Sequence, residues 1–433
     1  MIDISGKCNV LVLGYGVSGK SIYKFLKEKG HDVFVFEDSD ADVPDRITDI
    51  DWNNIDFLVK SPSIPFMSFN CHHVVEEAIK NGIPVISCFD VFRLHNPDAK
   101  IVAITGTNGK STTTALIHHI LNKSGVSVKM GGNIGIPYNE LPKADVYIFE
   151  MSSYELASSK YLDFDIAAVL NVEPDHLQFH GDFDNYVFAK HLALENSKSK
   201  IVSYEDFVTM SKYKDAADVT TLSFRDNNKA AIHIYEGALM DSGMAVIDLT
   251  VLMELRGKHN HQNALFAYQV CKQLGLQPKE IAKNMQSFKA LPHRLNTVRK
   301  IKNVLFVNDS KATNPGSSAR ALDTFVGYKI FWLVGGRSKK IDVLKFVEPH
   351  LDSIQKIYLF GESEDEFKGI FSGLRKVVSC GTMGKALEMA YKDASNEEGP
   401  SVVLLSPMCA SFDQFDSFEH RGNEFVQSVM ELI

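Results

Sequence analysis

The chain has 433 residues, of which 45% are hydrophobic and 23% are charged, and its formal net charge is −8. A chain of this length is expected to form about two to four domains of roughly 100 to 200 residues each. The net negative charge gives no reason to expect a surface for nucleic acid or for an anionic membrane, so any field that attracts a substrate must be local.

Six cysteines are scattered along the chain without a Cys-x-x-Cys pair. This pattern is typical of reduced thiols in a cytosolic protein and disfavours a disulfide framework or a zinc site, so we expect the cysteines to be core residues. The N-terminus lacks a basic segment followed by a long apolar one, and no apolar stretch approaches the roughly 20 residues that cross a bilayer. We expect a soluble, cytoplasmic monomer without membrane or nucleic-acid partners.

A glycine-rich loop follows the first predicted strand, Asn9–Leu13. A helix then runs to Gly30, and a second strand, Val33–Phe36, ends in the acids Glu37 and Asp38. This arrangement meets the dinucleotide fingerprint in full. The glycines only let the backbone approach a pyrophosphate, however, so NAD, FAD, another diphosphate and a plain tight turn all remain open. The loop residues are Gly14, Tyr15, Gly16, Val17, Ser18 and Gly19.

The rest of the first region alternates strands with a helix. Strands at Phe57–Val59 and Pro84–Ser87 flank a helix near Val74–Asn81, which completes a small doubly wound unit. The segment His95–Asp98 has the composition of a linker. We therefore predict a first domain over residues 1–95.

A second glycine-rich loop, Thr105–Thr112, reads Thr-Gly-Thr-Asn-Gly-Lys-Ser-Thr and joins the apolar strand Ile101–Ile104 to an amphipathic helix. Backbone N–H groups and a helix N-terminus attract phosphate in such a turn, Lys110 can reach the outer phosphates, and the Ser111 hydroxyl suits Mg²⁺. The standard Gly-x-x-x-x-Gly-Lys-Ser pattern would need glycine at Ile104, so we interpret this as a shortened phosphate loop. The alternative is a Gly-Asn turn with a solvated lysine.

Two later strands of the same region end in polar residues. The strand Val146–Phe149 runs into Glu150, which is a candidate Mg²⁺ ligand beside the phosphate loop or, alternatively, an ordinary exposed acid. The strand Ile166–Leu170 leads to Asp175 and His176, with His180 close behind, so His176 is a candidate ligand of a metal or a phosphate.

The remainder of the central region carries less chemical signal. Lys190 lies in a predicted helix, Tyr186–Asn196, and on the pattern alone it is a solvated surface lysine. Strand-like segments follow at Ala231–Tyr235 and Ala245–Leu249. A helix opens after Gly257, and the stretch Leu291–Leu295 resembles a hinge, so we predict a central domain over residues 96–296.

In the last region, residues 297–433, strands again alternate with helices, including a predicted helix at Val343–Leu351. This predicts a mainly parallel sheet whose ligands bind at the carboxyl ends of its strands. Three strand ends are polar: Asn308–Asn314, Gly335–Lys339 and Ser406–Phe415. The predicted fold class is α/β with three domains, each a mainly parallel sheet flanked by helices: Rossmann-like, phosphate-loop and Rossmann-like in turn.

These motifs in this order resemble the Mur ligases of peptidoglycan synthesis, and the resemblance spans essentially the whole chain. Within the family, the first glycine loop and the last polar stretches look most like the members that add D-glutamate. The Asp-Asn-Pro-Arg signature of the members that add diaminopimelate or lysine is absent. The segments that carry the resemblance are Thr105–Thr112, Glu150–Ser153, Asn171–His180, Pro292–Arg294, Asp309–Asn314 and Ser406–Arg421.

The resemblance implies an ADP-forming amide ligase. ATP would phosphorylate the carboxylate of UDP-N-acetylmuramoyl-L-alanine, and the amine of D-glutamate would attack the acyl phosphate. The implied catalytic residues are Lys110, His176 and Lys190. Two Mg²⁺ ions would be held by Ser111, Glu150, His176 and Lys190, the last as a carbamate formed from CO₂.

The resemblance also implies binding residues for each substrate. Those for ATP are Gly106, Thr107, Asn108, Gly109, Lys110, Ser111, Thr112, Asn263, Arg294 and Asp309. Those for the UDP substrate are Gly14, Tyr15, Gly16, Val17, Ser18, Gly19, Asn133 and Ser152. Those for D-glutamate are Lys311, Thr313, Lys339, Ser411 and Phe418. Two positions depart from the family pattern, because Arg337 stands where an acid is common and Gln178 where aspartate is common.

Three competing interpretations use fewer of these residues. A folate-directed ligase of the same superfamily is opposed by the UDP-type glycine loop in a separate first domain. An NAD-dependent oxidoreductase would leave Lys110, Glu150 and His176 unused. A nucleotide sensor would not need the polar strand ends of a third domain.

Overall fold

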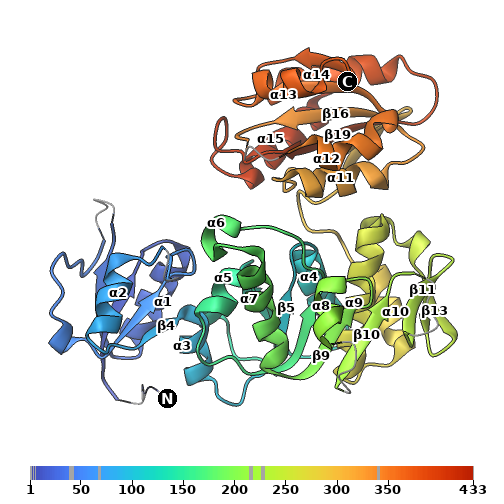
Figure 1. The fold of residues 1–433 in the computed structure, drawn as a ribbon. Coiled ribbons are helices and arrows are strands. Elements are labelled where there is room, and N and C mark those ends of the chain that lie inside the picture. The colour runs from blue at the N-terminus through green and yellow to red at the C-terminus, as the bar shows by residue number, and fades with distance from the viewer. Residues whose placement is uncertain are drawn as a thin grey trace. The chain divides into compact units, whose positions relative to one another are not determined.

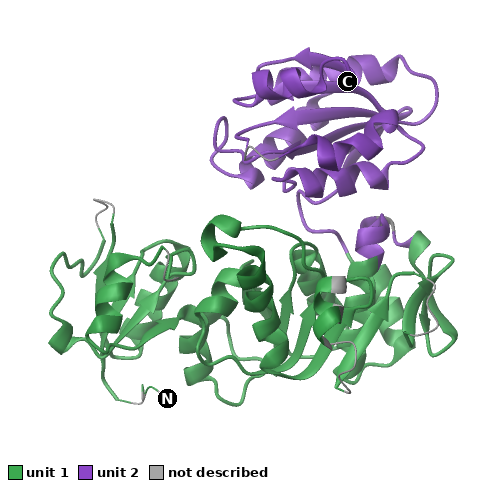
Figure 2. Cartoon of the chain, in the orientation of Figure 1, with its two compact units in different colours: residues 1–250, 262–288 green, residues 251–261, 289–433 purple. Residues whose placement is uncertain are grey.

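The computed structural model describes residues 2, 4, 6–38, 43–66, 70–213, 218–225, 230–338 and 342–432, which form three sheets (Figure 1). They divide into two compact units, residues 1–250 with 262–288 and residues 251–261 with 289–433 (Figure 2). The first unit contains two of the sheets and the second unit contains the third. None of the described helices is both long and apolar enough to cross a membrane.

The first sheet has four parallel strands in the order β2-β1-β3-β4. Successive residues of a strand face opposite sides, so β1 sends Val10 and Val12 into one core and Leu11 and Leu13 into another. The central position of β1 and β3 brings their carboxyl ends together. The elements are β1 (Asn9–Leu13), α1 (Val17–Glu28), β2 (Asp32–Phe36), β3 (Phe57–Lys60), α2 (His73–Lys80), β4 (Val85–Ser87) and α3 (Cys88–His95).

The second sheet has nine strands in the order β13-β12-β11-β10-β9-β8-β5-β7-β6. Strands β5 to β11 pair in parallel, whereas β12 and β13 add an antiparallel edge. Because β5 lies between β7 and β8, the carboxyl ends of these three strands meet. The strands are β5 (Lys100–Thr105), β6 (Val128–Gly132), β7 (Val146–Glu150), β8 (Phe164–Val169), β9 (Ser197–Ser203), β10 (Val219–Ser223), β11 (Ile232–Tyr235), β12 (Ala238–Asp241) and β13 (Met244–Asp248).

Helices pack on the second sheet, and several of them connect one strand to the next along the chain. They are α4 (Lys110–Lys123), α5 (Ser153–Ser158), α6 (Leu177–His180), α7 (Phe183–Glu195), α8 (Phe207–Tyr213), α9 (Lys258–Gln273) and α10 (Pro278–Gln286).

The third sheet has the order β14-β15-β19-β16-β17-β18, parallel except for the edge strand β14. Apolar cores lie on both of its faces. The strands are β14 (Asn296–Ile301), β15 (Val304–Asn308), β16 (Lys329–Gly335), β17 (Ile354–Phe360), β18 (Lys376–Ser379) and β19 (Ser401–Met408). The helices are α11 (Pro315–Thr324), α12 (Leu344–Val347), α13 (Glu364–Phe371), α14 (Met383–Ser395) and α15 (Phe418–Glu431).

The predicted fold class is confirmed, while the domain boundaries stay predictions. Two local expectations are corrected. The helix expected over Val343–Leu351 ends at Val347 and continues as a 3₁₀ turn, because Pro349 has no N–H for the helical ladder. All six cysteines are free thiols, but Cys71 is only partly buried and so is not a core residue.

Candidate active site

The phosphate loop connects β5 to α4, which begins at Lys110. Gly106 and Gly109 have φ angles of +149° and +86°, which favour glycine. A Cβ atom on Gly109 would overlap the side-chain oxygen of Asn263, so this loop approaches α9 where only glycine fits. The backbone N–H groups of Thr107 and Asn108 donate to Asn171 at 2.8 and 2.9 Å, which fixes the loop against the end of β8.

Two lysines converge on one carbonyl of this loop. Lys110 Nζ donates to the oxygens of Gly106 and Thr107 at 2.9 and 3.0 Å, and Lys190 Nζ donates to the same Gly106 oxygen at 2.8 Å. Lys190 is 1% exposed, and its ammonium lies 4.6 Å from the ring centroid of Tyr186. Burial, and then the positive charge of Lys110, lower the pKa of Lys190 well below its ordinary value.

The interpretation of Lys190 as a surface lysine is therefore wrong. Its helix, α7, packs against both α5 and β8, so the buried part of the helix is wider than one apolar stripe. The carboxylates of Asp175 and Glu150 act on Lys190 in the opposite direction to burial, since each raises its pKa. Lys110, Lys190 and these two acids thus share one electrostatic site.

Glu150 is also buried, with 2% of its surface exposed, so the alternative of an ordinary exposed acid is wrong. It ends β7 and pairs with Ile104, next to the start of the phosphate loop. Its Oε1 accepts from Asn133 Nδ2 at 3.0 Å, whereas within the described part of the chain Oε2 has no hydrogen-bond partner. A buried carboxylate oxygen without a donor is a suitable ligand for a hard cation, so this residue fits Mg²⁺.

The histidine segment lies at the end of β8. His176 has a φ angle of +54° and precedes α6, with its ring 5.0 Å from that of Tyr154. Asp175 Oδ2 lies 3.5 Å from His176 Nε2. His180 is fully buried beside Ser153 Oγ at 3.0 Å, and burial lowers the pKa of its imidazole to about 4, which keeps it neutral.

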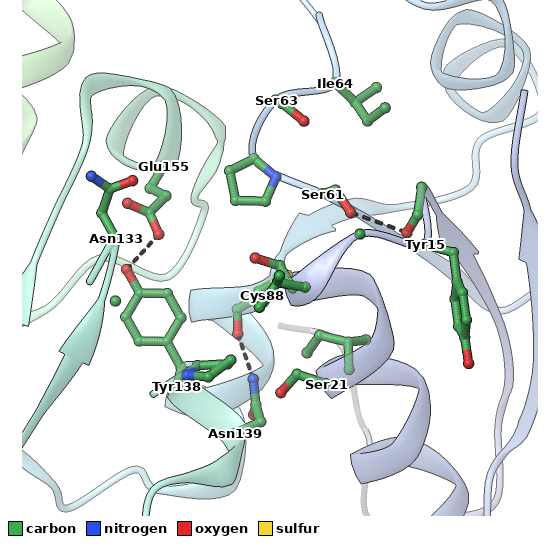
Figure 3. Close-up of a pocket in the computed structure, with 18 of the residues that line it drawn as sticks. Tyr15, Ser21, Ser61, Ser63, Ile64, Cys88, Asn133, Tyr138, Asn139 and Glu155 are labelled. Carbon is green, nitrogen blue, oxygen red and sulfur yellow. Dashed lines mark hydrogen bonds between the residues drawn. The ribbon is translucent and has the colours of Figure 1, made fainter. Parts of the chain in front are cut away.

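A cavity of about 550 Å³ opens at the carboxyl ends of β1 and β3 (Figure 3). Gly14–Ser18 and Asn133, all predicted for the UDP substrate, line it. Gly19 does not: it is buried, and its added Cβ would overlap the Gly14 oxygen, so Gly19 packs the loop rather than facing the cavity. Ser152 lines a neighbouring cavity of about 480 Å³, together with Asn133 and Gln178.

Several cavity residues were missed by the sequence reasoning. Ser61–Ile64 follows β3 and lines the 550 Å³ cavity, with Ser61 Oγ donating to the Gly14 oxygen at 3.1 Å. Glu155 accepts from Tyr138 Oη at 2.7 Å through Oε1 (Figure 3). Its Oε2 accepts from the N–H and hydroxyl of Ser152 at 2.8 and 2.9 Å. The position of Ser61–Ile64 directly after a parallel strand is the signal that could have identified it.

The second unit holds the residues predicted to meet the acceptor and part of the nucleotide. Asp309 Oδ2 accepts from Ser406 Oγ at 2.8 Å, and burial raises the pKa of this carboxyl to about 7. Lys311 Nζ lies 3.8 Å from the ring centroid of Phe418. Ser411 is buried and lies shortly after the end of β19 in the chain. Lys339 lies outside the described residues. Arg337, the departure from the family pattern, donates to Glu362 Oε2 at 3.1 Å.

The predicted ATP residues are divided between the two units. Asn263 lies on α9 against the phosphate loop in the first unit. Arg294 and Asp309 belong to the second unit, in and after a loop where His293 and Leu295 both have positive φ angles. Their contact with ATP stays a prediction.

A phosphate loop and a buried carboxylate on one mainly parallel sheet, with a cavity at the strand ends of a second sheet, define a multidomain α/β protein of the nucleotide-binding class. Two domain descriptions match the chain: "Mur ligase middle domain" over residues 104–271 and "Mur ligase, glutamate ligase domain" over residues 293–409. The chain belongs to the Mur ligase family.

Curated relatives match over nearly the full length of the chain. A UDP-N-acetylmuramoylalanine--D-glutamate ligase of Rhodospirillum rubrum is 35% identical over 451 residues, which cover 97% of this chain and 94% of that protein. A ligase of the same name from Chelativorans sp. is 36% identical over 98% of this chain and 95% of that protein. The predicted resemblance to the family is confirmed.

Solved structures share the fold at lower identity. The UDP-N-acetylmuramate-alanine ligase of Thermotoga maritima gives a TM-score of 0.62 at 17% identity and covers 98% of this chain and 99% of its own. The MurF ligase of the same organism, in complex with ADP, gives 0.58 at 17% identity and covers 87% of this chain and 96% of its own. These matches show the arrangement of sheets and helices and nothing finer.

Proposed function

We propose that this chain joins D-glutamate to UDP-N-acetylmuramoyl-L-alanine at the expense of ATP, in the cytoplasmic synthesis of peptidoglycan precursors. The observation that carries the proposal is the phosphate loop beside the orphaned, buried oxygen of Glu150, in a chain of the Mur ligase family. The names of the full-length relatives support D-glutamate as the acceptor. The enzyme acts as a monomer on small molecules and takes no macromolecular partner.

The reaction has two covalent steps. An oxygen of the substrate carboxylate attacks the γ-phosphorus of ATP, the bond to the leaving oxygen of ADP breaks, and an acyl phosphate forms. The amine of D-glutamate then attacks the acyl carbon, phosphate leaves, and the amine loses a proton. Lys110 neutralises charge on the phosphoryl oxygens during the first step, because its Nζ already lies at the loop carbonyls.

Mg²⁺ fits the oxygen and nitrogen donors of this site, and when bound it supplies positive charge that orients and screens the phosphates. Ser111 and Glu150 would hold one ion, and His176 and Lys190 would hold a second. The buried oxygen of Glu150 supports the first assignment directly. His176 lies at the end of β8, which is adjacent to β5 in the sheet, so it faces the same strand ends.

Lys190 serves the second ion as a carbamate. An ammonium cannot bind a cation, whereas reaction of a neutral amine with CO₂ gives an anionic carbamate and releases a proton. Burial lowers the pKa of Lys190, and this favours the reaction because it shifts the side chain toward the neutral, nucleophilic amine.

The remaining substrates take the sites predicted for them. The UDP part occupies the cavity lined by Gly14–Ser18, and the sugar and alanine extend past Asn133 toward Ser152. D-Glutamate binds in the second unit, at Lys311, Thr313, Ser411 and Phe418 and at Lys339, which lies outside the described residues. Arg294 and Asp309 are the ATP-binding residues that we propose in the second unit.

Phosphate release tests the proposal. The protein is supplied with ATP, Mg²⁺ and UDP-N-acetylmuramoyl-L-alanine, and the amino acid is varied. We expect release that depends on D-glutamate and on both other substrates. Release with another acceptor, and none above background with D-glutamate, would overturn the assignment.

A further inference from the structure

Arg421 is an arginine in the interior of the third sheet's domain, and the proposed chemistry leaves it unused. It lies on α15 with 0% of its surface exposed, on the same helix face as the buried residues Phe425 and Val429. Burial lowers the pKa of its guanidinium to about 10, so the side chain remains a cation at neutral pH. Among the described residues, no carboxylate forms an ion pair with it.

The guanidinium is satisfied by backbone and hydroxyl oxygens instead. Nε donates to Ser310 Oγ at 2.9 Å, and Nη2 donates to the backbone oxygens of Ser310 and Cys409 at 2.8 and 3.0 Å. Nη1 lies 3.4 Å from the backbone oxygen of Gly335. The hydrogen bonds of this buried charge all go to neutral oxygens, and the carboxylate of Asp413 acts on it only through its field. Such a charge is costly to keep, so its presence calls for an explanation beyond stability.

These acceptors come from three neighbouring strands. Ser310, Gly335 and Cys409 lie at or just beyond the carboxyl ends of β15, β16 and β19, which are adjacent in the sheet. Gly336 follows Gly335 with a φ angle of +128°, and a Cβ there would overlap the Ala410 oxygen at 2.2 Å and lie 3.1 Å from Arg421 Nη1, so only glycine fits beside the guanidinium. One side chain thus ties together the three polar strand ends of the domain.

The residues predicted to bind the acceptor lie in the same three strand-end segments and on the helix of Arg421. Lys311 follows Ser310 directly, and Ser411 comes shortly after Cys409. Phe418 begins α15, and its backbone oxygen accepts from Ser310 Oγ at 2.9 Å. Lys311 Nζ in turn lies over the Phe418 ring at 3.8 Å.

We propose that Arg421 is the positioning residue of the acceptor pocket: it sets the backbone from which the acceptor-binding side chains project and adds a fixed positive charge behind them. This rests on the proposed function. An acceptor with two carboxylates needs cations that are already in place, and a charge held rigidly in the interior attracts such a ligand without reorganising. Arg421 acts through its neighbours and does not touch the substrate.

The test compares Michaelis constants for the three substrates in Arg421→Met and Arg421→Lys. In Arg421→Met the KM for D-glutamate rises on the order of tenfold to a hundredfold, while the KM values for ATP and for the UDP substrate stay within about twofold. Arg421→Lys keeps the charge and loses the planar fork, so it recovers part of the loss. A purely structural role would instead lower the melting temperature and affect all three constants alike.

The matched control is Arg299→Met. Arg299 also donates to backbone oxygens of the α15 region, those of Val429, Met430 and Leu432 at 3.1 to 3.5 Å, but it lies on the edge strand β14. The Arg299→Met variant leaves the KM for D-glutamate unchanged. If Arg421→Met fails to fold, Ser310→Ala decides, because it removes one acceptor of the guanidinium and the tie to Phe418, and it raises the same KM by about threefold to tenfold.

Two results would overturn the inference: a KM for D-glutamate in Arg421→Met or Ser310→Ala within about twofold of the wild-type value, or an equal rise for all three substrates. Failure of the proposed function looks different, because the wild-type protein would then release phosphate with another amino acid. The Arg421 comparison would be made with that acceptor, and its outcome would be read in the same way.

Discussion

The two glycine-rich loops of the first unit make opposite use of similar sequences. Residues 14–21 read Gly-Tyr-Gly-Val-Ser-Gly-Lys-Ser, which meets the strict Gly-x-x-x-x-Gly-Lys-Ser pattern, whereas Thr105–Thr112 does not. In the first loop the helix begins at Val17, so Lys20 lies a turn inside α1, is exposed, and sits 5.7 Å from the Tyr15 ring centroid. In the second loop the helix begins at Lys110, whose Nζ folds back onto the loop.

The start of the helix therefore decides which lysine can meet a phosphate. Gly109, in the left-handed region, delays α4 until Lys110, and Gly16 at a φ angle of −69° lets α1 start before its lysine. A pattern search registers residue types and their spacing and does not register where the helix begins. The first loop is suited to bind a diphosphate that takes no part in the reaction, and the second loop is suited to contact phosphates that react.

A buried lysine accompanies each loop. Lys190 donates to the Gly106 oxygen of the second loop. Lys60 ends β3, is 1% exposed and donates to the Ile64 oxygen at 3.1 Å. The segment from Ser61 to Ile64 also contacts the first loop, because the Ser61 hydroxyl donates to the Gly14 oxygen. The two loops therefore differ most in the position of their own lysines, Lys20 and Lys110. They differ less in the buried lysines that support them, Lys60 and Lys190.

The largest expected effect comes from exchanging the two loop lysines for methionine, one at a time. Lys110→Met should lower turnover by about a thousandfold or more, because a cation aimed at the transferred phosphoryl group is lost in a water-poor site. Its affinity for the UDP substrate, measured by calorimetry, should not change. Lys20→Met, the matched control, should keep turnover within about twofold. Comparable losses in both variants would mean that the first loop also handles the reacting nucleotide.

The next effect concerns the lysine behind the second loop. Lys190→Ala should lose about a hundredfold in turnover and regain part of it in added acetate or propionate, since a short carboxylate can replace the carbamate as an anionic ligand. Phosphate release is measured with and without the acid. Lys198→Ala, which changes an exposed lysine paired with Asp165, is the control and should respond to neither change. Wild-type turnover in Lys190→Ala would remove the carbamate from the proposal.

Much of the fold could be predicted because parallel strands are continuous apolar runs. The strands β1, β5, β7 and β8 are of this kind, and all four were predicted. The strand β9, Ser197–Ser203, was missed because serine and lysine interrupt it, and the helix α15 was missed because it buries Arg421 and Gly422 where a pattern expects apolar residues. Local sequence does not reveal an arginine satisfied by carbonyl oxygens from distant strands.

The candidate site residues were predicted where chemistry and position coincide, at strand ends. Glu150 ends β7 and His176 follows β8, so the rule for parallel sheets pointed to both, and their roles stay predictions. Burial was harder to predict. Lys190 has the buried residues Tyr186, Ala189, Ala193 and Leu194 near it on its helix, and an apolar character on more than one face of that helix was the available sign that its lysine is enclosed. No local pattern distinguishes Arg294 and Asp309 as ATP-binding residues, and their role stays a prediction.

The smallest expected effect sharpens the comparison at the lysine beside the first loop. Burial lowers the pKa of Lys60 to about 8, against the opposing influence of Cys88, Glu155, Cys71 and Asp90. The unfolded chain keeps this proton up to about pH 10.5, so between the two values the unfolded state binds more protons than the native one. The free energy of unfolding must then rise with pH in this window.

Urea unfolding of the wild type and of Lys60→Met at pH 7.5 and 9.5 measures this contribution. Other groups titrate in both proteins, so the quantity of interest is the difference between them, and the wild type should gain about 2 kcal/mol relative to Lys60→Met. Over the same range the KM for the UDP substrate should rise by about twofold to fivefold in the wild type alone, because an uncharged amine holds the Ile64 oxygen less firmly. Parallel pH profiles for the two proteins would mean that Lys60 keeps its charge throughout this range.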